Sequence, residues 1–477
     1  MIRAPLLAST VAEHLGSVPD PWDVYAERAR RYEIQLRGTQ FETVRGPLHL
    51  EGYGVRVLRS IDGQTGVGFQ ASSDFEPASI RACVGAARDV ASFNRFPAHH
   101  PELPERGGRA PPNPAILDAD LWTDPLGALH QEATAILAAA DSQRLAPPTF
   151  VTLRATLIES SIANSRGLAT AYAHTAIERE VAVKSEGGPE GRPPGEYWFD
   201  EITRQTRRAG WETEMRDWHR FATDARRASP PPTGEYPVVL PSGVLSGILP
   251  PVLGFQFSAA SALRGLGVPT GTVVGGDALD VTDDGSVDWA LGSAPVDDEG
   301  TPQGTRPLIV AGRASAMVSD VLHANALSGT PTGNAIREGF ELVANYWQKF
   351  TRTPSPATTT LVVRPGNGGS DEELLDQVDE GVWVQKLGWA IPDPVAATFG
   401  GEIRIGYRIH HGKLGEPVRG GTVGGPVMTR DGRPSMLNGV VAMGSRATRS
   451  VNLLCPTLAV RNLLVSGEEL TDGSASG

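Results

Sequence analysis

Histidine pairs are the first place in this sequence to look for metal or acid–base chemistry. Ten histidines are present, and two adjacent pairs stand out, His99-His100 and His410-His411. Neighbouring side chains point in different directions, whereas two zinc ligands on a helix are separated by about one turn, so adjacent histidines rarely share a metal ion. We interpret His99-His100 as part of an exposed loop. We interpret His410-His411, which precedes Gly412, as the tip of a hairpin.

Three consecutive acidic residues, Asp297, Asp298 and Glu299, could supply carboxylates for the general acid–base chemistry of a hydrolase. Gly300 and Pro302 follow them, and carboxylates placed before Gly and Pro commonly accept backbone N–H groups in a turn. We therefore expect these three residues to cap a hairpin turn. The alternative is an enzyme that uses them in a site without zinc.

The sequence lacks the common nucleophile and phosphate-binding motifs. It contains no G-x-S-x-G elbow, P-loop, G-x-G-x-x-G or C-x-x-C motif. The glycine pairs at 420–421 and 424–425 indicate a strand edge, because no helix start follows them to hold a phosphate. The two cysteines, Cys83 and Cys455, do not indicate a disulfide scaffold.

Composition argues against nucleic acids and membranes as partners. The chain has 477 residues and a formal net charge of −12, and an acidic surface repels phosphate backbones. The stretch 236–263 has no charged side chain, but Pro250 and Pro251 would leave carbonyl groups unpaired in lipid, so we interpret it as buried core. Residues 1–20 lack the apolar run of a secretory signal, so we expect a cytoplasmic protein.

The first half of the chain shows both helix and strand signals. Alternating apolar residues predict strands over 41–69 and over 149–183, the latter around a turn at 164–167. Residues at helical spacing indicate four helical stretches: 21–39, 77–93, 128–140 and 199–226.

A proline run at 230–232, followed by Gly234, breaks both helix and strand. We therefore predict an α+β protein with an N-terminal mixed α/β domain over 1–228, a linker over 229–235 and a β-rich C-terminal domain with a few helices over 236–477.

Several segments, taken in order, resemble the TldD/PmbA metallopeptidase family over most of the chain. The segment 330–337, TPTGNAIR, resembles the family pattern T-x-T-G-N-x-x-R, and 297–302, DDEGTP, resembles its D-D-E-G-x-P turn. Further matches are GYGVRV at 52–57, NSRG at 164–167, RPG at 364–366 with EELL at 372–375, GYRI at 406–409 and PTL at 456–458. The resemblance makes Thr332, Gly333, Asn334 and Arg337 candidates for the substrate cleft.

The zinc motif of that family is missing from this sequence. Zinc-carrying members have H-E-x-x-x-H on a helix, and the segment 243–255 corresponds to it. Pro250 and Phe255 occupy the two histidine positions, and Pro251 occupies the glutamate position. None of these side chains can ligate zinc, which takes imidazole, thiolate or carboxylate. The C-G-K-x-G-Q run is also absent, and Cys455 comes too late to replace it. We expect Val252, Leu253, Phe255 and Phe257 to pack as core.

The resemblance implies a non-catalytic subunit that holds no metal or cofactor of its own. Zinc would be in a homologous partner, and the two chains would form a heterodimer that hydrolyses peptides or amides, either in general peptide turnover or in natural-product biosynthesis. The alternatives are a hydrolase with a rebuilt zinc-free site in the same cleft and a homodimeric scaffold or binding protein.

Overall fold

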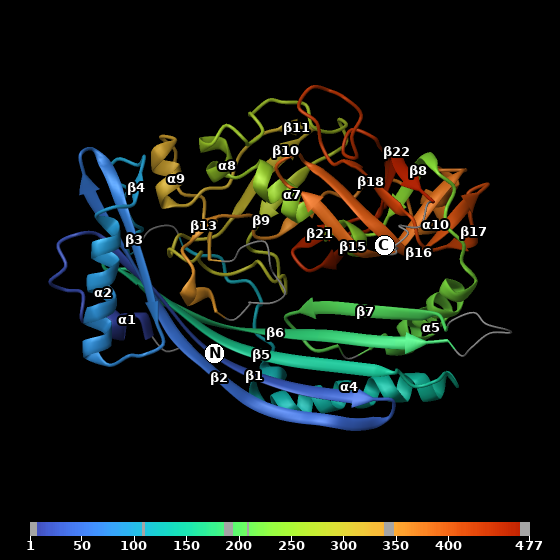
Figure 1. The fold of residues 1–477 in the computed structure, drawn as a ribbon, viewed down its shortest axis with the longest axis horizontal. Helices are drawn as coiled ribbons and strands as arrows, with labels where there is room; N and C mark the ends of the chain where they lie inside the picture. The colour runs from blue at the N-terminus through green and yellow to red at the C-terminus, as the bar shows by residue number, and fades with distance from the viewer. Residues whose placement is uncertain (1–6, 107–109, 186–193, 208, 338–347, 468–477) are drawn as a thin grey trace, which may run out of the picture.

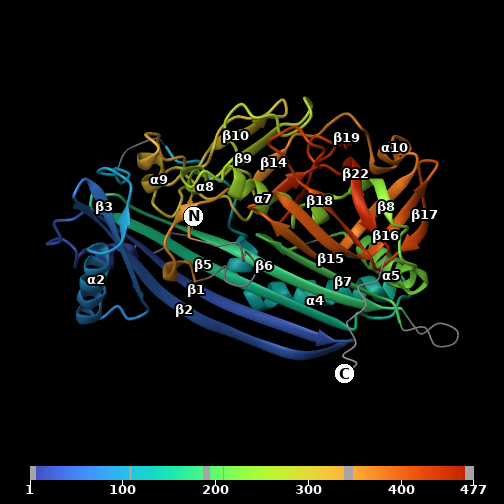
Figure 2. The ribbon, with the colours of Figure 1, turned by 45° about the horizontal axis from the view of Figure 1, so that its top comes forward.

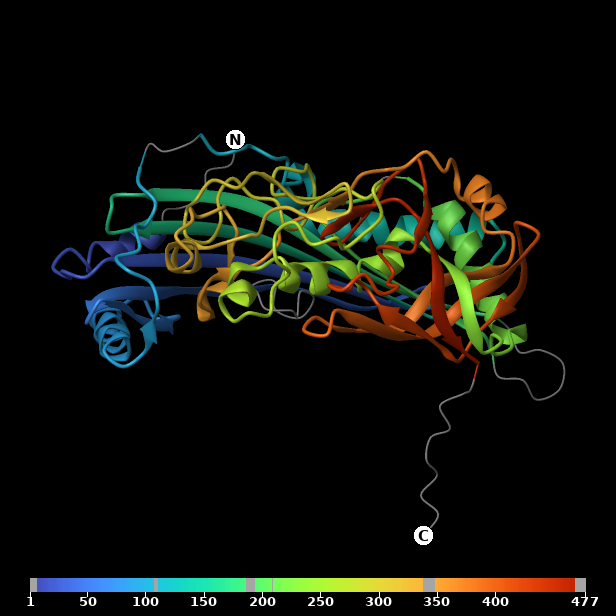
Figure 3. The ribbon, with the colours of Figure 1, turned by 90° about the horizontal axis from the view of Figure 1, so that it is seen from above.

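The computed structural model describes residues 7–106, 110–185, 194–207, 209–337 and 348–467. A long sheet built from the N-terminal half runs the length of the molecule, and the C-terminal half lies on one of its faces (Figures 1 and 2). Seen from above, the strands of the long sheet pass beneath the C-terminal half (Figure 3). The predicted α+β class, with a β-rich C-terminal region, is confirmed.

The long sheet is antiparallel throughout, with strand order β4-β3-β2-β1-β5-β6-β7. Its strands are β1 (Trp22–Arg37), β2 (Gln40–Ile61), β3 (Gln64–Ser72), β4 (Arg95–Phe96), β5 (Phe150–Asn164), β6 (Ala169–Lys184) and β7 (Glu196–Thr203). The strands predicted over 41–69 and 149–183 are confirmed, and the turn 164–167 joins β5 to β6.

The helix expected over 21–39 is wrong, because this segment is the central strand β1. Its charged side chains are paired across the sheet instead of lining a solvated helix face: Arg31 lies 3.0 Å from Glu178, and Glu33 lies 2.7 Å from Arg154. Opposite charges paired across the strands stabilise the sheet, and they override a weak helical pattern. The stretch 199–226 is likewise only partly helical, since β7 occupies its start.

Five helices of the described N-terminal half pack on this sheet or at its ends. They are α1 (Leu7–Ala12), α2 (Pro77–Ala91), α3 (Ala119–Thr123), α4 (Pro125–Ser142) and α5 (Trp211–Arg227). The helices predicted over 77–93 and 128–140 are therefore confirmed as α2 and α4. Buried Leu129, Ala133 and Ile136 line one face of α4, which covers the sheet face opposite the C-terminal half (Figure 1).

The C-terminal half contains two larger sheets and one two-stranded sheet. One larger sheet has the order β11-β10-β9-β14-β21-β20; the other runs β15-β8-β22-β18-β16-β17, with β15 also paired to β16 and β19 to β22. The first comprises β9 (Val281–Asp284), β10 (Thr305–Val310), β11 (Arg313–Ala314), β14 (Leu361–Val363), β20 (Thr448–Ser450) and β21 (Leu453–Cys455). The second comprises β8 (Gly234–Leu240), β15 (Gly381–Asp393), β16 (Thr398–His410), β17 (Lys413–Val418), β18 (Thr422–Pro426), β19 (Val440–Met443) and β22 (Leu458–Ser466).

Short helices join these strands. They are α6 (Ser242–Leu245), α7 (Leu249–Gln256), α8 (Ala259–Leu263), α9 (Val321–Ala326), α10 (Asp371–Asp376) and the 3-10 turn η1 (Lys349–Thr351), and the small sheet pairs β12 (Ala335–Ile336) with β13 (Ser355–Pro356). The uncharged stretch 236–263 is divided among β8, α6, α7 and α8. No helix within the described ranges has the length and apolar character needed to cross a bilayer.

The two halves share several hydrophobic clusters. The largest of these contains Trp218 of α5 together with Val239 of β8 and Trp383 of β15, and all three are buried. Another core lies wholly within the C-terminal half. The division into 1–228, 229–235 and 236–477 stays a prediction, since the packing crosses it.

A buried network of ion pairs also joins the halves. Asp23 of β1 lies 2.7 Å from Arg56 of β2 and 3.1 Å from Arg337. Arg56 in turn lies 2.6 Å from Glu299. None of these four side chains is more than 1 % exposed. Charges taken out of water in this way are tolerated only when each has a partner.

Replacing Asp23→Asn should therefore destabilise the protein strongly. The substitution leaves Arg56 and Arg337 without their shared carboxylate, and breaking a buried pair costs about 3–5 kcal/mol. Thermal unfolding measures the change. The control is Glu42→Gln, which removes the partner of Arg37 from an exposed pair and should change stability by less than about 1 kcal/mol. Equal effects of the two substitutions would contradict a stabilising role for the network.

Candidate functional site

A cavity of about 300 Å³ lies between the C-terminal half and the long sheet. Helices α7 and α8 form one wall, and the opposite wall comes from β6, the residues after β7, and η1. The apolar lining includes Pro250, Pro251, Phe255, Leu291 and Ile336. The titratable lining residues are Tyr172, His174, Arg204, Arg264, Asp298 and Lys349.

Helix α7 begins at Leu249, so that Pro250 and Pro251 stand in its first turn. Proline fits there because the first N–H groups of a helix have no intrahelical partner. Val252, Leu253 and Phe257 are buried in the core, as expected.

The expectation that Phe255 also packs as core is wrong. Phe255 is only partly buried and lines the cavity beside Pro250 and Pro251. The two histidine positions and the glutamate position of the family's zinc motif therefore all lie in the cavity lining.

The residues present do not fit a zinc ion. Proline has no side-chain donor atom, and phenylalanine offers only an apolar ring, so none of the three positions on α7 can coordinate a metal. The carboxylate of Asp298 and the imidazole of His174 also line the cavity, but two ligands are fewer than a zinc site requires.

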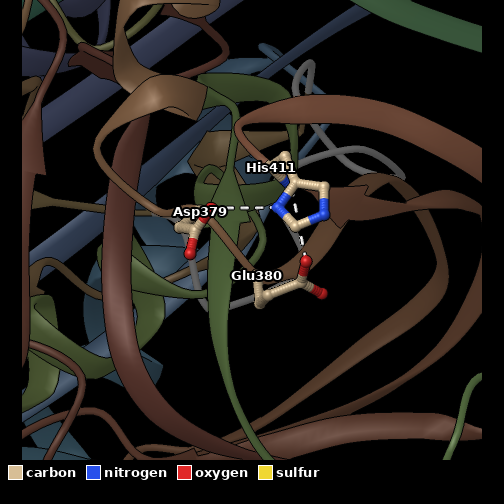
Figure 4. A group of neighbouring side chains, drawn as sticks. All are labelled: Asp379, Glu380 and His411. Atoms are coloured by element: carbon tan, nitrogen blue, oxygen red, sulfur yellow. Dashed lines mark hydrogen bonds and ion pairs between the residues drawn. The ribbon is translucent and has the colours of Figure 1, made fainter.

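In the described part of the chain, one group has three metal-type ligand atoms close together, and it lies elsewhere. Asp379, Glu380 and His411 meet at the surface, where the α10–β15 turn approaches the tip of the β16–β17 hairpin (Figure 4). All three are exposed, and His411 lies 3.8 Å from Asp379. The hairpin tip predicted at His410-His411 is confirmed. Solvated charges in such an arrangement need no metal ion, and none of them lines the cavity.

His174 is the one imidazole in the cavity lining, and its surroundings disfavour the protonated form. It is 4 % exposed. Burial lowers the pKa of His174 well below its ordinary value, and the positive charges of Arg204 and Lys349 lower it further. The Arg204 guanidinium lies against the Nδ1 atom of His174 and donates to the backbone carbonyl of Ser293 at 3.2 Å. The polar wall of the cavity thus places the charged Arg204 and Lys349 beside an imidazole whose protonated form is disfavoured.

The three acidic side chains at 297–299 are buried, and each has different partners. Asp297 caps the turn as expected, because its Oδ1 atom accepts the backbone N–H groups of Glu299 and Thr301 at 3.0 and 2.8 Å. Asp298 lines the cavity and lies 3.5 Å from Lys349. Glu299 faces away from the cavity toward Arg56. The turn interpretation therefore holds for Asp297 and is incomplete for the other two carboxylates.

The segment 332–337 adjoins the cavity, and hydrogen bonds hold it in place. Thr332 donates to the side-chain oxygen of Asn334 at 2.7 Å, and Asn334 donates to Asp283 at 2.6 Å. Gly333 has a φ of +81°, and a Cβ there would lie 2.4 Å from the Pro302 carbonyl. Arg337 is 1 % exposed within the ion network. The cavity lining includes Ile336 but none of the four candidates, and their role in the substrate cleft stays a prediction.

The sequence interpretation missed the residues of the polar wall. His174 sits on β6, Arg204 follows β7, and Lys349 lies on η1. No short motif contains them, and their separation along the chain gives no signal of proximity. An isolated histidine within a predicted strand was the one available hint.

Comparison with protein-family models shows which family the chain belongs to. Residues 22–91 match the family model for PmbA/TldA metallopeptidase domain 1, and residues 233–467 match that for the PmbA/TldA metallopeptidase C-terminal domain. Together these matches cover more than half of the chain. The chain belongs to the TldD/PmbA family.

Individual members of the TldD/PmbA family are distant in sequence. A metalloprotease TldD homologue from Buchnera aphidicola (subspecies Schizaphis graminum) is 27% identical over 195 residues, which is 40% of this chain and 38% of that protein. A PmbA homologue from Buchnera aphidicola (subspecies Acyrthosiphon pisum) is 25% identical over 191 residues, 40% of this chain and 36% of that protein. The chain therefore matches less than two fifths of the length of these relatives.

Solved structures of similar proteins share the whole fold. A Thermotoga maritima protein described as a candidate modulator of DNA gyrase superimposes with a TM-score of 0.77 at 18% identity, covering 96% of this chain and 99% of the other. TldE from Thermococcus kodakarensis gives 0.74 at 17% identity, with coverage of 97% and 99%. At this identity the likeness establishes the fold alone.

The burial of Glu299 should make stability depend on pH. Burial raises the pKa of the Glu299 carboxyl from 4.5 to about 7, although Arg56 favours the charged form. A group with a raised pKa in the folded state contributes stability that is fully present below pH 4.5 and is lost as the pH rises through about 7. We expect Glu299→Gln to give a shallower decline of unfolding temperature across this range.

The slope against pH is the readout, because Glu299→Gln also weakens the contact with Arg56 and lowers stability at every pH. Glu372→Gln, on the exposed side of α10, serves as the control and should retain the wild-type slope. A slope unchanged by Glu299→Gln would show that this carboxyl stays ionised in the folded protein.

Proposed function

We propose that this chain is the non-catalytic subunit of a heterodimeric zinc metallopeptidase whose partner, a homologue with an intact H-E-x-x-x-H motif, performs the hydrolysis. The observation that carries the proposal is the occupation of three cavity-facing positions on α7 by Pro250, Pro251 and Phe255. A peptidase of this family needs two imidazoles and a carboxylate there, and replacing all three removes both the metal and the activation of water.

The role left to this chain is to complete the fold of the pair and the cleft that holds a peptide or amide substrate. The resemblance supports a partner of the same family, in which members without the zinc motif pair with members that carry it. General peptide turnover and natural-product biosynthesis are both settings for such a pair. The long sheet and the shared core are kept although the ligands are lost, which is the pattern expected when a subunit is retained for assembly.

The purified chain should hold far less than about one zinc ion per molecule, because the cavity offers fewer ligands than a zinc site needs. Elemental analysis after dialysis against buffered zinc measures the content. His411→Ala is the control for weak binding at the surface group, and it should remove any residual zinc. A stoichiometric ion that is lost on replacing His174 instead would contradict the proposal and favour a rebuilt site in the cavity.

Co-expression with a homologue that carries H-E-x-x-x-H should give a stable heterodimer. Obligate partners bury more than about 2,000 Å² of surface, so the complex should survive dilution during size exclusion. Native mass spectrometry distinguishes the heterodimer from the two homodimers. A chain that stays monomeric, or that forms only homodimers beside such a homologue, would contradict the proposed pairing and favour a scaffold or binding protein.

A further inference from the structure

The C-terminal sheet that contains β15, β16, β18 and β22 has one face in the core and a second face that this chain covers only in part (Figures 1 and 2). On the first face, Val423 and Val465 are fully buried in the core of the C-terminal half. On the second face, Trp383, Tyr407 and Ala459 pack in the cluster that includes α5. Farther along β15 and β22, this second face carries exposed apolar side chains.

A row of directly opposed residues crosses the exposed part of the second face. Ile391 of β15 pairs with Gly400 of β16. Gly400 pairs with Gly424 of β18, which in turn pairs with Leu464 of β22. The neighbouring row contains Val423 and points into the core. Because successive residues of a strand point to opposite faces, Ile391 and Leu464 point away from that core. They are 71 % and 56 % exposed.

This row is apolar and has glycine at its centre. A Cβ added at Gly400 would meet no atom within 4 Å, so the surface between Ile391 and Leu464 is open above that glycine. Trp389, two residues before Ile391 on β15, is 75 % exposed and leaves roughly 150 Å² of its side chain in water. The charged Glu235 of β8 stands beside Leu464 at the margin. We call the following set the apolar platform: Trp389, Ile391, Gly400, Gly424 and Leu464.

Charge and shape favour a homologous subunit as the partner that covers the apolar platform. An exposed apolar patch with a polar margin is typical of an interaction site. The chain carries a formal net charge of −12, and two chains of such charge repel each other, so close association needs a contact surface without charges. Like chains pair most often about a two-fold axis, in which the same surface of each meets the other, and a homologue with the same fold can use that geometry.

We propose that the apolar platform is the surface through which this chain binds its homologous zinc-bearing subunit. The proposal rests on the proposed function, because the partner is the one inferred there. Trp389 is the anchor, since tryptophan is enriched among the residues that carry most of the binding energy of an interface. The two glycines let the partner approach the sheet closely, and Glu235 stays at the solvated rim.

Charge substitutions on the platform test the proposal in titrations of the full chain with a homologue that carries H-E-x-x-x-H. Ile391→Glu and Leu464→Glu should each raise the Kd of the heterodimer at least about tenfold, because the contact would bury an unpaired carboxylate. Phe93→Glu is the matched control, since Phe93 is 86 % exposed beyond the end of α2 and outside the platform. It should keep the wild-type Kd.

A second pair of variants adds bulk without charge. Gly400→Leu and Gly85→Leu each place a side chain where a Cβ meets no atom within 4 Å, so both single chains should fold. Leucine at position 400 fills the centre of the platform and should also raise the Kd at least about tenfold. Leucine at position 85, on α2, should leave the Kd unchanged. Thermal unfolding of each variant shows that it is folded.

The outcomes separate this surface from the proposed function. If the wild-type chain forms the heterodimer and folded Ile391→Glu and Leu464→Glu bind as tightly as Phe93→Glu, the assigned surface is wrong and the proposed function stands. If the wild-type chain forms no heterodimer, both are wrong. A homodimer that these two substitutions dissociate, without any heterodimer, would show that a second copy of this chain covers the platform and would overturn the assignment to a homologue.

Discussion

Asp23 is a fully buried carboxylate that pairs with two arginines from different parts of the chain. Arg56 reaches it from the neighbouring strand, and Arg337 reaches it from the C-terminal half, at 2.7 and 3.1 Å. A charge in this position is costly unless each partner stays in place, so the pairing fixes how the C-terminal half lies on the long sheet. The cavity lies between these same two parts. Its shape therefore depends on an interaction that is not part of its lining.

Under the proposed function, the wall formed by α7 is a metal site that has been lost while its surroundings are kept. Prolines in the first turn preserve the helix start, and Val252 and Leu253 keep their place in the core. Pro250, Pro251 and Phe255, at the positions of the zinc motif, all lie in the cavity lining. On this account, a helix of the same kind is kept without its ligands, and an apolar surface stands where the family's imidazoles would project.

Sequence patterns predicted the elements whose signals are local. The amphipathic helix at 77–91, the glycine-cut strands after Phe41 and the hairpin at His410-His411 all follow from short-range chemistry. β1 was misassigned because its charges are satisfied by cross-strand partners such as Glu178, which lie far away in sequence. The polar cavity wall was missed for the same reason. His174, Arg204 and Lys349 meet only through tertiary packing, and no spacing along the chain encodes that. Family resemblance found the altered α7 positions, but only the structure shows that Phe255 faces the cavity.

Peptide hydrolysis by three samples, namely this chain alone, its zinc-bearing homologue alone and the reconstituted pair, tests the account most directly. The account predicts that this chain alone has no turnover, and that the activity of the pair is abolished by a chelator and by replacing the glutamate of the partner's H-E-x-x-x-H motif. Hydrolysis by this chain alone that persists in the presence of chelator would contradict it, and would show that the cavity beside α7 is itself an active site.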